Sequence, residues 1–333
     1  MTQSSNRPYN DSECSVCRDK LKNDSIETTQ RETPNDIPAI TIDGYPLSRY
    51  PSAGDLKEAA ILTRASQSQV NLAASFEQQK QQEQLARHLP VVKLPYGFGP
   101  VPPDNGKVFF FDIDNCLYKK STKIHDLMQI YIHRFFKKHL HLNDKDAYRL
   151  HMKYYKEYGL AIEGLVREHR IDALEYNKVV DDALPLDQIL KPNVELRNFL
   201  IRMKNSGKVD RLWLFTNAYK NHGLRVIRLL GIGDLFDGMT FCEYANVPMV
   251  CKPLRGAFDK ALEDAGVTDP KNAYFLDDSE INVEAAVKYG WGHVARYLEG
   301  DEEDKEVEGV KVVRDVKELE TVYPELFNRY GSQ

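Results

Sequence analysis

The fold is decided by residues 108–118, which have the sequence VFFFDIDNCLY. The first four residues are apolar without alternation, which is typical of a parallel strand buried on both faces. Asp112 and Asp114 follow directly, so their carboxylates would extend from the carboxyl end of that strand. Open α/β sheets bind ligands at this edge. Because paired aspartates also occur in ordinary turns, the stretch indicates a site only if other strands bring polar groups to the same edge.

Two further runs, 212–215 and 273–276, are apolar in the same way. Each leads directly into polar residues, and a lysine stands in a later loop before a helical segment. These polar residues are Thr216, Asn217, Lys252, Asp277 and Asp278. Since the carboxyl ends of parallel strands share one edge of a sheet, the three strands together predict a site rather than a set of unrelated turns.

Strand and helix patterns alternate through the second half of the chain. Further strands are predicted at 239–242, 293–297 and 310–313, and helices at 221–230, 254–265, 280–289 and 316–327. Residues 124–200 break the alternation because they show only helical periodicity. The pattern predicts an α/β protein whose helical insertion lies over the ligand edge of a parallel sheet. The predicted domains are a core over 104–121 and 201–330, a helical cap over 122–200, and a tail and linker over 1–103.

The tail is rich in Ser, Thr, Asn, Gln and Pro, so residues 1–103 are predicted to be mostly disordered. Residues 72–89 contain good helix formers and are predicted to form a transient or loosely docked helix. The prolines and glycines of 90–103 then predict a linker. Cys14 and Cys17 form a single C-x-x-C pair, and without a second pair they do not predict a zinc site.

The composition excludes several classes of protein. The 333 residues carry a net charge of −5, which gives no reason to expect a nucleic-acid partner. No apolar run is long enough to span a bilayer, and the first residues lack a signal-peptide core. Five scattered cysteines do not form a disulfide framework. We therefore expect a protein of the cytosol, with the nucleus as a second location.

The ordered motifs resemble the haloacid dehalogenase superfamily of phosphohydrolases over about residues 107–325. Asp112-Ile113-Asp114 matches the first motif, Thr216 the second, Lys252 the third, and Asp277-Asp278 the fourth. The resemblance implies a Rossmann-like parallel sheet with a helical cap inserted after the first strand. It also implies hydrolysis of a small-molecule phosphomonoester with Mg²⁺ as cofactor.

The resemblance assigns a role to each motif residue. Asp112 would attack phosphorus and form an aspartyl-phosphate, while Asp114 would act as general acid and then general base. Thr216, Lys252 and the main chain around Asn217 would bind the phosphoryl group. The metal ligands would be Asp112, the main-chain carbonyl of Asp114, and Asp278, with Asp277 beside it or acting through water.

Two residues of the first motif carry further information. The dehalogenases that give the superfamily its name lack the second aspartate, so Asp114 favours phosphate chemistry. Cys116 stands where a threonine usually follows the aspartates, and a hydroxyl hydrogen bond is lost there. Cys116 has no activating base nearby in sequence, so we do not expect it to be a nucleophile.

The cap resembles that of the pyrimidine 5′-nucleotidase group over residues 154–165 and the segments that follow. Tyr155 and Tyr158 are candidates for stacking on a base, although tyrosines at helical spacing are more often packing residues. Gly159 and Gly164 suggest a hinge between cap helices, and His169 is expected to be structural. The expected substrate is a nucleoside 5′-monophosphate, with UMP and CMP favoured, as in nucleotide salvage.

Two alternatives stay open. The first keeps the mechanism but replaces the substrate with lysophosphatidic acid or a sugar phosphate. The second is a non-catalytic regulatory protein that uses the fold only for binding. The complete motif set argues against the second alternative, because a binding module does not need every one of these groups.

Overall fold

The computed structural model describes residues 74–327, so Cys14 and Cys17 lie outside the described residues. Within this range one six-stranded parallel sheet has the strand order β3-β2-β1-β4-β5-β6. The strands are β1 (Val108–Phe111), β2 (Arg211–Phe215), β3 (Gly238–Thr240), β4 (Ala273–Asp277), β5 (His293–Tyr297) and β6 (Val310–Val313). β1 pairs with β2 on one side and β4 on the other, so the chain reverses its winding direction at β1. The prediction of a parallel α/β sheet is confirmed.

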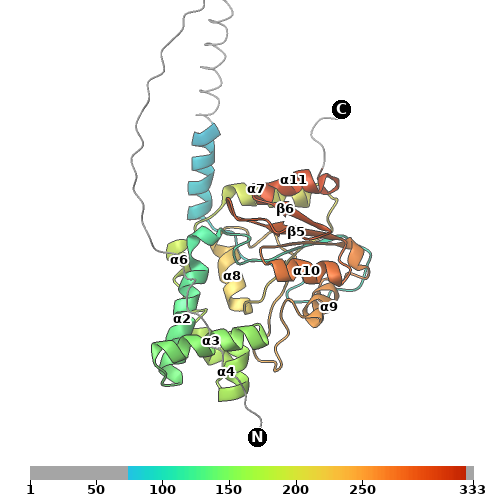
Figure 1. The fold of residues 1–333 in the computed structure, drawn as a ribbon. Helices are drawn as coiled ribbons and strands as arrows, with labels where there is room; N and C mark the ends of the chain where they lie inside the picture. Colours follow the sequence, from blue (N-terminus) through green and yellow to red (C-terminus); the bar gives the residue numbers. More distant parts are fainter. Residues whose placement is uncertain (1–73, 328–333) are drawn as a thin grey trace, which may run out of the picture. The chain divides into compact units, whose positions relative to one another are not determined.

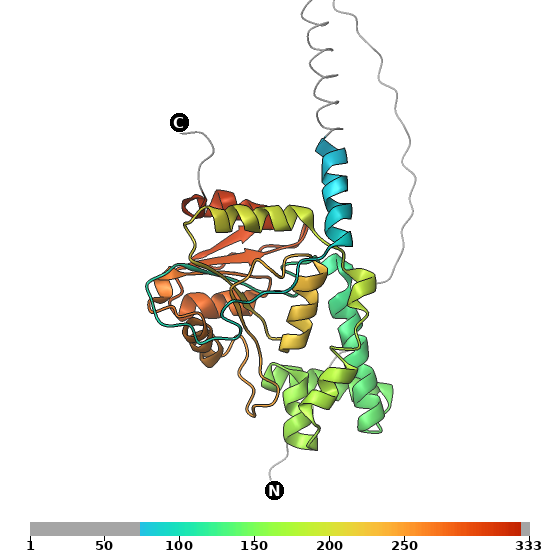
Figure 2. The same ribbon diagram turned by 180° about the vertical axis from the view of Figure 1, so that it is seen from behind.

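Helices cover both faces of the sheet (Figures 1 and 2). α7 (Val194–Asn205) and α11 (Leu319–Val322) lie on one side, and α9 (Arg255–Asp264) and α10 (Glu280–Lys288) on the other. α8 (Lys220–Leu229) follows β2 and contributes buried residues to the same apolar cluster as α7. The short 3-10 helices are η1 (Lys120–Thr122), η2 (Pro270–Asn272), η3 (Val316–Glu318) and η4 (Pro324–Leu326).

β1 shows why its sequence does not alternate. Phe109 and Phe111 belong to the apolar cluster on the α7 face, while Val108 and Phe110 belong to the cluster on the α9 and α10 face. All four side chains are fully buried. Burying one such side chain stabilises a fold by about 1.5–3 kcal/mol, so polar substitutions on either face would destabilise the centre of the sheet.

The cap follows β1 and consists of helices. They are α2 (Ile124–His139), α3 (Asp144–Tyr158), α4 (Ala161–His169), α5 (Ala173–Val179) and α6 (Leu186–Ile189). The cap has its own apolar cluster, which includes Phe136, Tyr154 and Leu165. Cys242 and Cys251 of the core belong to this cluster too, so the cap packs directly on loops at the carboxyl edge of the sheet.

α7 crosses the predicted boundary between cap and core at residue 200. Its buried residues Leu196, Phe199 and Met203 belong to the apolar cluster on the α7 face of the sheet. The boundary therefore divides a helix that belongs to the core. Helical periodicity identifies a helix but does not say which apolar surface it covers, and this is why the sequence placed the boundary inside α7.

The helix predicted over 72–89 is present over 74–87. Its Gln82 binds the backbone on both sides of Asn193 through Pro192 O and Val194 N. The segment after it hydrogen-bonds to the core through Lys93, Tyr96 and Val101. Its prolines and glycines prevent regular structure, as predicted, but the other backbone groups pair with the core, so the segment is not a free linker.

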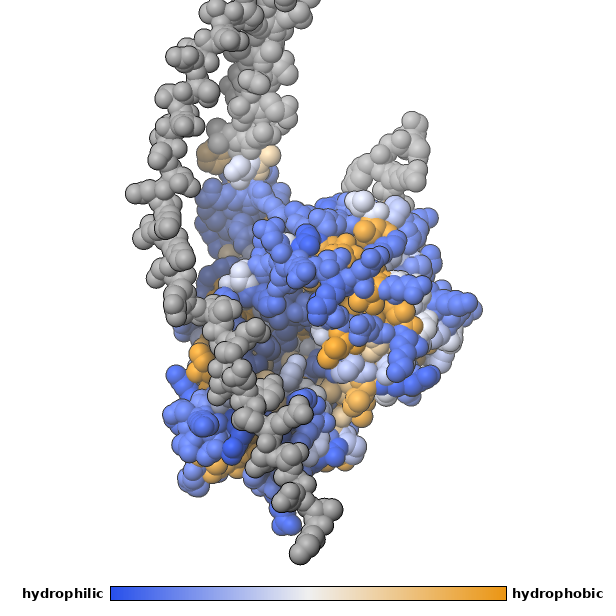
Figure 3. Space-filling view, in the orientation of Figure 1, coloured by the Kyte–Doolittle hydropathy of each residue, from blue (hydrophilic) through white to orange (hydrophobic). Residues whose placement is uncertain are grey.

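The C-terminal part also differs from its prediction as one helix over 316–327. Three short elements, η3, α11 and η4, replace it. Pro324 explains the break, because proline cannot donate the hydrogen bond that would continue α11. In the part of the chain that the structure describes, no helix is long and apolar enough to cross a membrane. Hydrophilic residues cover most of the face seen in Figure 3, and hydrophobic residues gather over the part that carries the sheet.

Candidate active site

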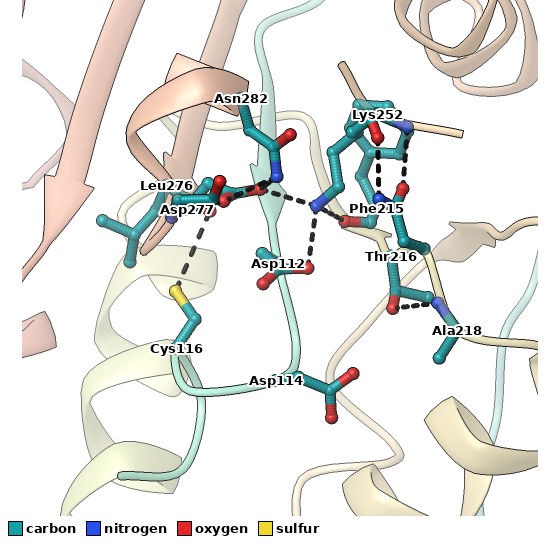
Figure 4. Close-up of polar contacts among 12 residues, drawn as sticks. Asp112, Asp114, Cys116, Phe215, Thr216, Ala218, Lys252, Leu276, Asp277 and Asn282 are labelled. Atoms are coloured by element: carbon teal, nitrogen blue, oxygen red, sulfur yellow. Dashed lines mark hydrogen bonds and ion pairs between the residues drawn. The ribbon is translucent and has the colours of Figure 1, made fainter. Parts of the chain in front are cut away.

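The central strands deliver polar groups to one edge of the sheet. Phe111 of β1 is in register with Leu214 of β2 and Leu276 of β4. One residue further along, the chain reaches Asp112 after β1 and Asp277 at the end of β4. Thr216 follows β2 at the next position. Figure 4 shows Asp112 and Asp277 converging on Lys252, with Thr216 on the neighbouring loop, as the three apolar runs of the sequence predicted.

Lys252 connects the three strands. Its Nζ donates hydrogen bonds to Asp112 Oδ1 at 2.8 Å, Asp277 Oδ2 at 2.6 Å and the main-chain oxygen of Phe215 at 2.7 Å. Burial alone would lower the pKa of Lys252, but the carboxylates of Asp112 and Asp277 outweigh burial and raise it. The lysine therefore stays cationic beside the nucleophile candidate, where it can stabilise negative charge.

Asp277 and Asp278 have different environments. The side chain of Asp277 is fully buried and also accepts hydrogen bonds from Ser279 N at 2.9 Å and Asn282 Nδ2 at 3.0 Å. Its oxygens are thus occupied by protein donors. Asp278 is only partly buried, and burial followed by the charge of Asp277 raises its pKa. Asp278 is the more available of the two as a ligand.

Three carboxylates could hold a metal ion. Ligand atoms of Asp112, Asp277 and Asp278 all lie within 4.8 Å of one another. Burial raises the pKa of Asp112, and Asp277 and Asp278 raise it further, while Lys252 lowers it. One lysine faces three carboxylates, so a divalent cation would relieve the remaining repulsion. Oxygen-only donors suit a hard cation such as Mg²⁺.

Thr216 and Asn217 occupy the position opposite this carboxylate group. Thr216 is buried, and its Oγ1 accepts a hydrogen bond from Ala218 N at 3.0 Å, which leaves the hydroxyl proton free for an acceptor. Asn217 Oδ1 accepts a hydrogen bond from Lys252 N at 2.7 Å, and Asn217 Nδ2 donates one to the main-chain oxygen of Lys252 at 2.8 Å. The Asn217 side chain therefore fixes the position of the lysine, and only its main chain remains for phosphate binding.

Asp114 lies on the loop after β1, apart from the hydrogen bonds around Lys252 (Figure 4). Tyr118 Oη and His222 Nε2 both approach its Oδ1, at 2.5 and 2.7 Å. Burial raises the pKa of Asp114, but the charge and hydrogen bond of His222 outweigh burial and lower it. His222 was not predicted from the sequence. Its place in the first turn of the helix after β2 was the only indication that it reaches the site edge.

Cys116 takes no part in this arrangement as a nucleophile. Its thiol is buried and faces the main-chain oxygen of Leu276 at 3.8 Å, which is a weak contact. Burial, followed by the charge of Asp112, raises the pKa of the thiol well above its usual range. A protonated, buried thiol is unreactive, so the structure agrees with the expectation from sequence.

The hydrogen bond of Tyr158 stays within the cap, and Tyr155 presents its ring to solvent. Tyr155 is half exposed, and Tyr158 donates a hydrogen bond to Glu168 at 3.0 Å within the cap. His169 pairs with Tyr154 at 2.7 Å, which is a structural contact. Gly164 lies inside α4, where a Cβ would come within 2.2 Å of the Tyr154 ring. Gly164 therefore allows close helix packing, and the hinge interpretation is wrong for this glycine.

The comparisons with known proteins agree with this architecture. The haloacid dehalogenase-like hydrolase family matches residues 107–290. Phosphate metabolism protein 8 of Saccharomyces cerevisiae is 48% identical over 206 residues, which are 60% of this chain and 64% of the relative. The chain thus spans less than two thirds of that relative's length.

Solved structures give weaker likenesses. A HAD phosphatase from Thermococcus onnurineus has a TM-score of 0.45 and 18% identity, and the match covers 65% of this chain and 97% of that one. CbbY from Rhodobacter sphaeroides in complex with phosphate has a TM-score of 0.46 and 18% identity over 64% and 96% of the two chains. The family match spans more than half of the chain and includes all four motifs. The chain belongs to the haloacid dehalogenase-like hydrolases, a family whose fold supports phosphomonoester hydrolysis.

Proposed function

We propose that the protein is a Mg²⁺-dependent phosphomonoesterase that hydrolyses nucleoside 5′-monophosphates through an aspartyl-phosphate intermediate. The observation that carries the proposal is the buried Asp112, held 2.8 Å from the Lys252 ammonium with Asp277 and Asp278 beside it. The nucleophile and the phosphate dianion are both anionic, so their repulsion must be offset. The fixed Lys252 cation, and a metal ion held by the carboxylates, would offset it.

The residues act in two steps. Asp112 forms a bond to phosphorus and the bond to the ester oxygen breaks. Asp114, which must first take up a proton because His222 lowers its pKa, gives that proton to the departing alkoxide. Asp114 then takes a proton from water, the resulting hydroxide attacks phosphorus, and inorganic phosphate leaves with Asp112 restored. Lys252 and Thr216 bind phosphoryl oxygens throughout.

Asp112, the main-chain carbonyl of Asp114 and Asp278 would hold the metal. A bound Mg²⁺ neutralises charge on the phosphate and lets the anionic nucleophile approach. The different environments of Asp277 and Asp278 support this division of roles. Asp277 already satisfies Lys252, Ser279 and Asn282, whereas Asp278 is more available.

The nucleoside part of the proposal rests on Tyr155. Gly159 follows the end of α3, and a Cβ there would lie 3.9 Å from the sulfur of Cys251, the residue before Lys252. The main-chain oxygen of Tyr155 accepts the hydrogen bond from Gly159 N, so Tyr155 lies one helical turn before Gly159. Its half-exposed ring is available for stacking, which tolerates either pyrimidine.

A lysophospholipid is the second candidate substrate. Val250 and Leu254 flank Lys252 on the same loop, and they are 40% and 49% exposed. Exposed apolar side chains beside a phosphate site would favour an ester with an acyl chain. This candidate keeps the mechanism and changes only the group that the cap and loop select.

The test is phosphate release from UMP, CMP, sugar phosphates and lysophosphatidic acid, with Mg²⁺ or with EDTA. Asp112→Asn is compared with Asp259→Asn, an exposed aspartate of α9 that serves as the matched control. Metal-dependent release from UMP or CMP that Asp112→Asn abolishes and Asp259→Asn retains supports the full proposal. Release only from the other esters keeps the mechanism and rejects the nucleotide, and release from none of the esters contradicts the proposal.

A further inference from the structure

We propose that His222, together with Tyr118, is a positioning residue that holds one oxygen of Asp114 and leaves the other free for proton transfer. The inference deepens the proposed function and rests on it, because Asp114 needs this placement only if it serves a leaving alkoxide. His222 acts through Asp114 and does not itself contact the phosphate ester.

The hydrogen bonds are one-sided. Tyr118 donates to Asp114 Oδ1 at 2.5 Å, and His222 Nε2 lies 2.7 Å from the same atom. Among residues 74–327, no hydrogen bond reaches Asp114 Oδ2. The Asp114 side chain remains 25% exposed. A carboxylate with one anchored oxygen has a defined direction for its other oxygen.

The two donors come from different elements. Tyr118 lies on the loop after β1, as Asp114 does, whereas His222 lies in the first turn of α8, after β2. α8 packs closely on β3 and on the first loop at Gly223, where a Cβ would lie 2.8 Å from Met239 Sδ and 3.0 Å from Ile113 Cδ1. Because Gly223 follows His222 and Ile113 precedes Asp114, this close packing fixes the distance between the His222 imidazole and the Asp114 carboxylate.

His222 has no evident structural task besides this bond. Its side chain is fully buried, and its Nδ1 has no hydrogen-bond partner within the described range 74–327. It does not cap α8, since the N-cap residue is Tyr219 and no side chain caps the helix. Burying a polar ring with one unpaired nitrogen destabilises a fold. The hydrogen bond to Asp114 is therefore the contact that explains the burial of the His222 ring.

The test uses the difference between leaving groups. UMP and glycerol 2-phosphate release an alkoxide that must be protonated, whereas p-nitrophenyl phosphate releases a phenolate that is stable without a proton. We compare kcat/KM, because it reports the steps up to the aspartyl-phosphate and excludes the later hydrolysis. A misplaced general acid therefore lowers kcat/KM for the alkyl esters and much less for the aryl ester.

The variants are His222→Leu, His222→Gln and Tyr118→Phe. We expect His222→Leu to lower kcat/KM for the alkyl esters by roughly 10- to 100-fold, with a change of less than about threefold for the aryl ester. His222→Gln can still donate a hydrogen bond in the same direction and should recover part of the loss. Tyr118→Phe removes only a hydroxyl, so it should show the same selectivity for alkyl esters even if His222→Leu fails to fold.

The outcomes separate the two proposals. Equal losses on alkyl and aryl esters, or no loss in any of the variants, would overturn the positioning role and leave the phosphatase intact. A wild-type protein that releases phosphate from none of the three esters would overturn the proposed function and the inference with it. Loss on alkyl esters alone, with rescue by His222→Gln, supports both.

Discussion

The carboxyl edge of the sheet and the cap use different kinds of interaction. At the edge, Asp112, Lys252 and Asp277 are almost completely buried and bonded to one another. In the cap, an apolar cluster fixes the helices, while the candidate recognition residue Tyr155 is half exposed. Buried charges that depend on one another cannot change singly without a large penalty. The comparison therefore predicts large effects of substitution at the edge and small, substrate-dependent effects in the cap.

The largest effect should come from Asp112→Asn. The amide cannot form the acyl phosphate, so we expect kcat to fall by at least about 10⁴-fold. Lys252 keeps Asp277 and the Phe215 oxygen as partners, so the protein should stay folded. Steady-state phosphate release and thermal unfolding measure the two effects. Activity above one part in a hundred of wild type would show that Asp112 is not the nucleophile.

The next effect should come from Lys252→Met. The substitution removes the cation and leaves the buried carboxylates of Asp112 and Asp277 without a counter-charge. Removing one partner of a buried ion pair lowers the free energy of unfolding by about 3–5 kcal/mol. Lys317→Met is the control, because Lys317 pairs with Glu195 while 43% exposed, and such pairs contribute about 0–1 kcal/mol. Denaturant unfolding in EDTA measures the free energy of unfolding of wild type and of the two variants. Equal losses in the two variants would remove the distinction between the edge and the surface.

Metal binding should stabilise the edge of the sheet. A ligand that binds only the folded state adds about 2.7 kcal/mol at a concentration 100 times its Kd. We expect Mg²⁺ to raise the unfolding midpoint of wild type and to have little effect on Asp278→Asn. In EDTA the same variant should be at least as stable as wild type, because it removes one of three mutually repelling carboxylates. A full Mg²⁺ response in Asp278→Asn would exclude Asp278 as a ligand.

The sequence predicted the edge better than the cap, and the reason is physical. Buried parallel strands are apolar on both faces, so β1 has the predicted bounds, and β2 and β4 differ from theirs by one residue each. The polar residues that follow strands are then placed by topology alone. His222 was missed because its link to Asp114 depends on how closely α8 approaches the first loop, which periodicity does not show. For the same reason, sequence could not show that residues 88–103 pair with the core.

A smaller effect should come from Tyr155→Ala in the cap. If the ring stacks on the base, its loss removes about 1–3 kcal/mol of binding. KM for UMP should rise roughly fivefold or more, while kcat/KM for a sugar phosphate should stay the same. Tyr148→Ala is the matched control, because Tyr148 lies on the same helix and is 61% exposed. The same rise in KM from both variants would reject Tyr155 as the base-binding residue.

The smallest effect should be an acid sensitivity of the cap. His151 of α3 is buried against Phe136, and burial, followed by the charges of His133 and His125, lowers its pKa from 6.5 to about 4. The unfolded chain therefore binds the proton first, so His151 lowers stability as the pH falls from 6.5 towards 4. The thermal midpoint of wild type should fall by a few degrees more than that of His151→Leu over this range, since 1 kcal/mol corresponds to about 2–4 °C in a domain of this size. If the thermal midpoints of the two proteins change in parallel with pH, protonation of His151 does not affect the stability of the cap. The cap would then differ from the edge of the sheet, where buried charges determine stability.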